Sequence, residues 1–427
     1  MLDQLQQALD TLLERFNALV SLARARLTGE EEPEPIYALP SPRYEEHLSI
    51  PIRETSVDDA AAREAEARGQ FLARQDRWLE LTAEIREADL ERRATPGGVP
   101  ISELLAFGAR SDVVLAAEHA LEDGKPSRDA DLIEGIKSLE ATRASVGGNP
   151  YMALILALAH LDIGWAWRGT GWSSQMPALN REKCVAHFDR AADLMAPHCG
   201  IELDSPLIAS AHCALLSGRR DPKTRVADDY EDLIDLDPHN NRHMRALGYH
   251  LLPHWFGSYE ALELEALRTA SRTHDIWGAG GYTWVMFDAI TIDPKACARV
   301  DTAFFIEGLH DILKARPEQE MVNLLAAYCA VAIRQSEGES TSADLTRLQI
   351  AECTDWLVRD HLKEIHPLVW AHAMNGFDNN ARVSSINRFA ARGRKSAIEA
   401  IGDLFREEIE LGVHVTFTQD GPKLDAA

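Results

Sequence analysis

The stretch Tyr230-Glu-Asp-Leu-Ile-Asp-Leu-Asp-Pro-His-Asn-Asn241 decides the fold of this chain. It opens with an aromatic residue, continues with apolar residues spaced along one helix face, and closes with Leu-Asp-Pro. The second helix of a helical hairpin buries its aromatic face against the first and then stops, so that the next hairpin can stack. Pro238 supplies that stop, because proline cannot continue an α-helix. The stretch therefore predicts the second helix of a stacked hairpin.

The same arrangement recurs along the chain. Phe188-Asp-Arg-Ala-Ala-Asp-Leu-Met-Ala-Pro197 repeats it closely, Ile312-Leu-Lys-Ala-Arg-Pro317 is a weaker copy, and Ile365-His-Pro367 is a candidate fourth. The four prolines are separated by 41, 79 and 50 residues, and the gap of 79 fits two units with a missing stop near Arg272–Asp275. A regular tetratricopeptide unit has about 34 residues, so these hairpins are longer and less regular. We predict an all-α, tetratricopeptide-like superhelix over residues 151–410.

The segments outside this region differ in composition. We predict an amphipathic N-terminal helix over 1–27, then a Pro-rich acidic linker or extended strap over 28–56. A helical extension over 57–150 follows, and its first helix is expected to run from 57 to 93. Val413–Thr418 alternates with period two, which predicts one short strand in the C-terminal tail, 411–427.

The charge of the chain limits its partners. The 427 residues include 68 acidic and 44 basic side chains, for a net charge of −24. Such a charge repels phosphate backbones and anionic lipid, so neither nucleic acid nor a membrane is an expected partner. The longest apolar run, Tyr151–Ile163, is interrupted by His160 and Asp162 and is too short to span a bilayer. With no secretory leader and only six scattered cysteines, we expect a cytoplasmic protein with free thiols.

Two segments that flank the predicted hairpin ends resemble those of a known family. Trp165-Ala-Trp-Arg-Gly169 precedes the two hairpin ends, and Leu252-Pro-His-Trp-Phe-Gly-Ser-Tyr259 follows them. Over about residues 150–290 the chain resembles an uncharacterised bacterial helical-repeat family that pairs a Trp-x-x-Arg-Gly segment with a Pro-basic-Trp-Gly-Gly-Ser segment. Phe256 stands where that second segment has its first Gly. The resemblance implies a tetratricopeptide-like fold and no particular activity.

The same two segments supply the candidate binding residues. They are Trp165, Trp167, Arg168, Trp172, His250, His254, Trp255, Ser258 and Tyr259. Trp and Arg are favoured anchors of binding surfaces, and Arg168 could clamp a carboxylate or a phosphate. The alternative is structural: the Trp rings fill the hairpin core, Arg168 pairs with an acid, and the His residues support turns.

Three functions remain open at this stage. Stacked hairpins usually bind peptides or proteins, so a binding or scaffold protein with a protein or peptide partner is the first expectation. A hydrolase-like enzyme with His250 or His254 as general base is the alternative. A metal site in the loose series Cys184, His187, His198, Cys199, His212 and Cys213 is the third, although the spacing of these residues is not typical of zinc. No catalytic motif, metal ligand set or cofactor is singled out, and the oligomeric state stays open.

Overall fold

Helices make up most of the chain that the computed structural model describes, which is residues 44–121, 134–169, 176–335, 337–338, 340–375 and 385–425. The chain divides into two units, Met1–His47 and Leu48–Ala427. In the first unit, the described residues form the short helix α2 (Tyr44–His47). The predicted N-terminal helix and residues 28–43 of the predicted linker lie outside the described residues. The fold below is that of the second unit.

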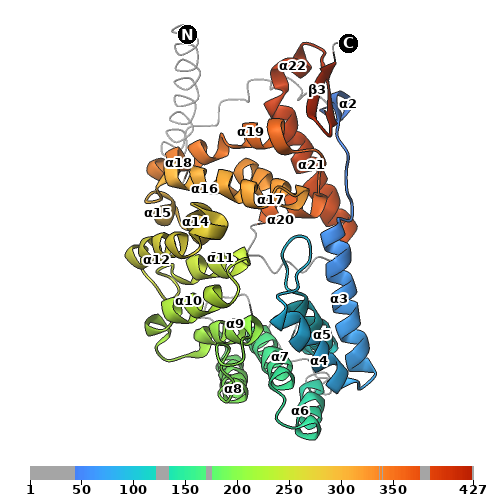
Figure 1. Ribbon diagram of the computed structural model, residues 1–427, viewed down its shortest axis with the longest axis vertical. Helices are drawn as coiled ribbons and strands as arrows, with labels where there is room; N and C mark the ends of the chain where they lie inside the picture. Colours follow the sequence, from blue (N-terminus) through green and yellow to red (C-terminus); the bar gives the residue numbers. More distant parts are fainter. Residues whose placement is uncertain are drawn as a thin grey trace. The chain divides into compact units, whose positions relative to one another are not determined.

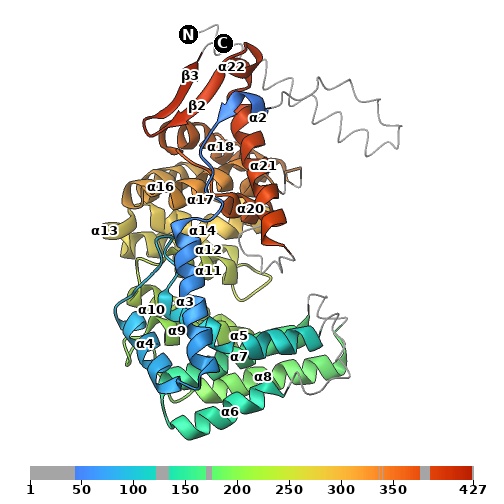
Figure 2. The same cartoon turned by 90° about the vertical axis from the view of Figure 1, so that its right-hand side faces the viewer.

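Four helices precede the region of the predicted repeats: α3 (Val57–Arg74), α4 (Trp78–Leu90), α5 (Ile101–Ala120) and α6 (Gly135–Val146). The prediction of one helix over 57–93 is wrong, because the chain turns between α3 and α4, where Asp76 takes a left-handed φ of +52°. The turn lets both α3 and α4 pack on α5, as Figures 1 and 2 show. It brings Trp78 and Leu81 of α4 into the core.

The longer helices that follow come in consecutive pairs. In chain order they are α7 (Pro150–Arg168) and α8 (Ala178–Met195), α9 (Pro206–Ala214) and α10 (Val226–Leu236), α11 (Asn241–His250) and α12 (Tyr259–Arg272), α14 (Gly280–Ile292) and α16 (Thr302–Ala315), α17 (Gln319–Ala330) and α18 (Thr341–Ala351), and α20 (Pro367–Asn375) and α21 (Ile386–Leu404). Figure 1 shows them following one another from green to red. Helices pack within pairs, as in α7–α8 and α20–α21, and between pairs, as where α11 and α12 both pack on α14. The all-α prediction is confirmed for the described residues.

Short helical turns fill the connections. They are η4 (Leu215–Gly218), η5 (Pro222–Thr224), α13 (His274–Trp277), α15 (Pro294–Cys297), η6 (Ala332–Arg334), α19 (Thr354–Trp356), the π-helical turn η7 (Leu357–His361) and α22 (Arg406–Glu410).

Most of the predicted helix stops are confirmed. α8 ends at Met195, α10 at Leu236 and α16 at Ala315, each just before its proline. α12 ends at Arg272, inside the interval predicted for the missing stop. Pro367 instead begins α20, where the missing N–H of a first-turn proline costs nothing, so the fourth predicted stop is wrong.

A small sheet closes the C-terminal end. The predicted strand is confirmed as β2 (His414–Thr418), and it pairs antiparallel with β3 (Gly421–Asp425) and parallel with β1 (Leu48–Ser49). The chain after β1 continues as an extended strap: Ile365 N donates to the carbonyl oxygen of Pro51, and Arg53 N donates to that of Ile365, both at 2.8 Å. Neither partner of β2 was expected from the sequence.

No helix among the described residues is both long and apolar enough to cross a bilayer.

Candidate binding surfaces

The Trp165–Arg168 segment is the last turn of α7, and its side chains diverge. Trp165 keeps 37% of its surface exposed and meets the Phe188 ring edge-on, with centroids 5.5 Å apart. The guanidinium carbon of Arg168 lies 5.6 Å from the Trp165 ring centroid. Trp167 is buried in the core, whereas Trp172 lies outside the described residues. The one hydrogen bond of Arg168 within the described residues goes to the carbonyl oxygen of Gly169, at 3.1 Å, so no described acid neutralises it.

The second segment forms a cluster of rings at the turn from α11 to α12. We call Tyr249, His250, His254, Trp255 and Phe256 the aromatic surface. None of the five is buried. His250 and Phe256 stack at 3° with centroids 5.6 Å apart, and Tyr249 lies 5.5 Å from Trp255. The contacts hold the rings to one another and leave part of each exposed to solvent.

His250 is anchored on its inner side. Its Nδ1 lies 2.7 Å from the hydroxyl of Tyr230 on α10 and 3.0 Å from the carbonyl oxygen of Ala246 one turn earlier. Burial lowers the pKa of His250 to about 4. A neutral imidazole of such low basicity, engaged at Nδ1, is poorly suited to act as a general base near pH 7.

We expect the ring protons of His250 to titrate with a midpoint near pH 4 in an NMR titration, because its pKa is lowered to about 4 from 6.5. An unfolded chain takes up this proton near pH 6.5, so stability is lost as the pH falls from 6.5 towards 4. His250→Gln should therefore be less sensitive to acid over that window. A midpoint near 6.5 for His250 would contradict its partly buried position.

Ser258 and Tyr259 have structural partners. Ser258 caps α12, since its hydroxyl accepts a hydrogen bond from Ala261 N at 3.2 Å. Tyr259 donates its hydroxyl to Asp293 Oδ2 at 3.0 Å, and Arg299 covers its ring at 5.2 Å. Both residues fix the start of α12, and with it the turn that carries the aromatic surface.

The two predicted segments are not brought into one pocket. The described ring contacts of Trp165 and Arg168 reach Phe188 and each other, and those of His250 and Trp255 stay within the aromatic surface and Tyr230. None of these residues lines the cavities described below. An enzyme site that closes around both segments therefore has no supporting geometry within the described chain.

The Cys/His series is likewise dispersed. No group of three or more His, Cys, Asp or Glu side chains in the described chain is placed to hold a metal ion. His187 Nδ1 instead lies 2.8 Å from His160 Nδ1, and His160 Nε2 lies 3.2 Å from Glu140, which also accepts from Arg190 at 2.7 Å. Burial lowers the pKa of both imidazoles, that of His187 to about 4. These polar side chains tie α6, α7 and α8 together.

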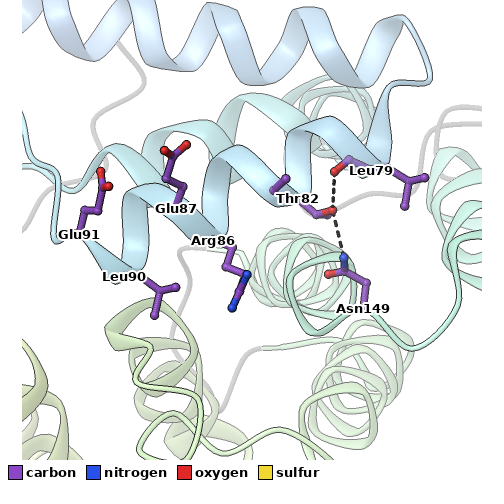
Figure 3. Close-up of a pocket in the computed structure, with 8 residues that line it drawn as sticks. Leu79, Thr82, Arg86, Glu87, Leu90, Glu91 and Asn149 are labelled. Atoms are coloured by element: carbon purple, nitrogen blue, oxygen red, sulfur yellow. Dashed lines mark hydrogen bonds between the residues drawn. The ribbon is translucent and has the colours of Figure 1, made fainter.

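One cavity beside α4 has a volume of about 410 Å³ (Figure 3). One face of α4 and Asn149 line it, and Figure 3 shows Thr82 and Asn149 pointing toward each other. Asn149 donates to the Thr82 hydroxyl at 3.1 Å, and that hydroxyl donates to the carbonyl oxygen of Leu79 at 3.2 Å. Thr82 and Asn149 are thus bonded to each other and to the backbone of α4.

A second cavity, of about 230 Å³, was not expected from the sequence. We call it the turn cavity, because the α4–α5 loop, the start of α9, the α10–α11 turn and Arg316 line it. Arg92 donates to the carbonyl oxygen of Leu236 at 3.1 Å and pairs with Asp204 at 2.6 Å, while Arg316 donates to the carbonyl oxygen of Pro96 at 2.6 Å. The α4–α5 loop is therefore bound to the turns that follow α8, α10 and α16.

Asp89 of α4 is one of the residues that line the turn cavity. It accepts hydrogen bonds from Leu207 N at 3.0 Å, from the hydroxyl of Tyr151 at 3.1 Å and from the hydroxyl of Ser205. Burial raises the pKa of Asp89. Asp237, His239 and Asn240, of the stretch Asp237-Pro-His-Asn240 that the sequence analysis singled out, also line the cavity. Their spacing indicated a helix stop but not the distant loop that faces it.

Comparison of the chain with protein-family models, with curated proteins and with solved structures gives no significant match.

Proposed function

We propose that this chain is a tetratricopeptide-like repeat protein that binds a protein or peptide partner through the aromatic surface. The spacing of its helix pairs supports the repeat class. The first helices of the four middle pairs begin at residues 206, 241, 280 and 319, at intervals of 35, 39 and 39 residues, whereas the flanking intervals, from 150 to 206 and from 319 to 367, are 56 and 48 residues. The three middle intervals are near the roughly 34 residues of a regular unit, and the flanking pairs are longer.

The observation that carries the binding proposal is the exposure of the aromatic surface. The neighbouring helices bury their large rings completely, as Trp284, Phe287 and Tyr328 illustrate. The rings of the aromatic surface stay partly in water although they could contribute to a core. Exposed aromatic clusters are the residues that most often anchor a protein interface.

Trp255 is the largest ring of the aromatic surface. Its Nε1 is shielded from water and has no hydrogen-bond acceptor within the described residues. The core residues Trp167 and Trp284 share this feature, so it does not by itself distinguish Trp255. What distinguishes Trp255 is that its ring is only partly buried and lies among the other rings of the aromatic surface.

Trp165 and Arg168 extend the proposal to a second contact. The Trp165 ring is exposed, and no described acid pairs with the Arg168 guanidinium beside it. This pair suits a partner that presents an acidic side chain or a carboxylate flanked by apolar residues. The net charge of −24 disfavours nucleic acid as that partner. The six free cysteines agree with a cytoplasmic location.

Selection of peptides from a displayed random library on the folded chain tests the proposal. Trp255→Ala should weaken the binding of the selected peptides by about 30-fold or more, because removal of an anchoring Trp costs about 2 kcal/mol or more of binding free energy. Binding is measured by fluorescence anisotropy.

Phe71→Ala is the matched control, since Phe71 is 48% exposed on α3, away from the aromatic surface. The control should bind like the wild type. Failure to enrich any peptide, or equal affinity of Trp255→Ala and Phe71→Ala, would refute the proposed surface.

A further inference from the structure

One row of mostly apolar residues on α4 faces solvent. Leu79, Ala83, Arg86 and Leu90 follow one another at steps of four, three and four residues, so they lie on one side of the helix. The row lines the cavity beside α4 (Figure 3), and Leu79 keeps 69% of its surface exposed. The opposite side of α4 is already buried in the core. The row is therefore not needed to hold α4 in place.

The exposed apolar surface continues onto the turn between α8 and α9. Arg92 Nη1 donates to the carbonyl oxygens of Leu90 and Asp204, at 3.1 and 3.0 Å, so these two backbones are close neighbours. Leu203 precedes Asp204 and is exposed, as is Ile201 in the same turn. Apolar side chains gathered on a surface are typical of an interaction site. We call this region the α4 surface, and it consists of Leu79, Ala83, Arg86, Leu90, Ile201 and Leu203.

The N-terminal segment of the chain carries a matching pattern. Residues 2–24 lie outside the described residues, and their sequence predicts an amphipathic helix. Leu5, Leu9, Leu12 and Phe16 follow one another at steps of four, three and four residues, which are also the steps of the row on α4. Two helices whose apolar residues repeat at these steps pack along each other as in a coiled coil.

We propose that the α4 surface binds the N-terminal segment, residues 2–24, of a second copy of this chain. Each copy supplies one surface and one segment, so a two-fold dimer uses both pairs and leaves neither open. In each pair the row from Leu5 to Phe16 lies along the row from Leu79 to Leu90. The aliphatic stem of Arg86 covers this apolar contact while its charge stays in water. The interface is separate from the aromatic surface and does not depend on the peptide-binding proposal.

The course of the chain after Leu48 favours a second copy over the same chain. Figure 1 shows the strap and α3 running in one direction, from β3 toward α4. Residues 49–56 of the strap and the 18 residues of α3 together span about 53 Å, at about 3.3 Å per extended and 1.5 Å per helical residue. To reach α4 of its own chain, the linker before Leu48 would have to run back over this length, and holding it extended costs conformational entropy. A second copy related by a two-fold axis needs no such return.

Sedimentation velocity of the full chain tests this interface, and we expect a concentration-dependent dimer. Leu79→Glu should weaken the dimer by about tenfold or more, because it removes a leucine from each contact and desolvates a carboxylate in its place. Leu9→Glu should weaken the dimer in the same way, because it interrupts the row of the segment. Leu345→Glu is the matched control, since Leu345 is 62% exposed on α18, and it should associate like the wild type.

A mixture of the two damaged variants separates exchange between copies from docking within one chain. Leu79→Glu keeps an intact segment and Leu9→Glu keeps an intact α4 surface, so a mixed dimer has one undamaged contact. Fluorescently labelled Leu79→Glu should therefore bind Leu9→Glu more tightly than it binds itself, and both variants should keep the circular dichroism of the wild type. The proposal is overturned if the wild type stays monomeric, if Leu79→Glu or Leu9→Glu associates like Leu345→Glu, or if the mixture forms no dimer stronger than that of either variant alone.

Discussion

Gly248→Ala is expected to destabilise the protein by roughly 2–3 kcal/mol, a typical cost of an overpacked core. Gly248 lies on α11 where this helix crosses α14. An added Cβ would stand 1.7 Å from the carbonyl oxygen of Val285, which is a backbone atom and cannot move away by changing a rotamer. α14 is itself held by α12 and α16, so the two helices must separate.

Thermal unfolding measures this cost as a drop of several degrees in Tm. Gly148→Ala is the matched control, because nothing lies within 4 Å of the position of its Cβ. Tyr249 and His250 directly follow Gly248, so peptide binding should weaken in Gly248→Ala as well. Equal melting temperatures for the two variants would mean that α11 and α14 do not approach as closely as described.

Features set by neighbouring residues could be predicted from the sequence. A proline ends a helix within one turn, so Pro197, Pro238 and Pro317 marked helix ends correctly. The alternation of apolar and polar residues over Val413–Thr418 likewise predicted β2 correctly. Each of these signals acts over a few residues and needs no distant partner.

Features set by distant partners could not be predicted. The break between α3 and α4 contains neither proline nor glycine, and it forms because α3 and α4 each pack on α5. β1 has only two residues, and its pairing of Leu48 with Val415 spans most of the chain. Local composition carries no sign of either contact.

In the candidate sites, too, the groupings of residues close in sequence could be predicted and those of distant residues could not. The rings of the aromatic surface are neighbours in sequence, so the sequence already grouped His250, His254 and Trp255. Trp165 and Trp167 are two positions apart on α7 and therefore point in different directions, which separates an exposed ring from a buried one. The turn cavity depends on a loop more than 130 residues before Asp237, and spacing alone could not reveal it.

Asp89→Ala is expected to be the most damaging of the substitutions considered, at roughly 3–5 kcal/mol. The alanine leaves three donors without an acceptor, from Leu207 N, Tyr151 and Ser205, and they belong to or flank α7 and α9. Asp89→Asn should cost only about 1 kcal/mol, because the amide oxygen still accepts from Leu207 N and the two hydroxyls can turn to accept from its amide. Chemical denaturation of both variants measures the difference.

The pH dependence of the Asn variant tests the cause of this difference. Burial raises the pKa of Asp89 above its ordinary value of 3.8, so the folded chain holds this proton to a higher pH than the unfolded chain does. Stability contributed by Asp89 is therefore greatest near pH 4 and declines as the pH rises through the folded pKa. Asn carries no such charge, and the deficit of Asp89→Asn should shrink between pH 4 and pH 7. A deficit that instead grows with pH would mean that Arg92 and the three hydrogen bonds outweigh desolvation, and that Asp89 is held as a stabilised anion.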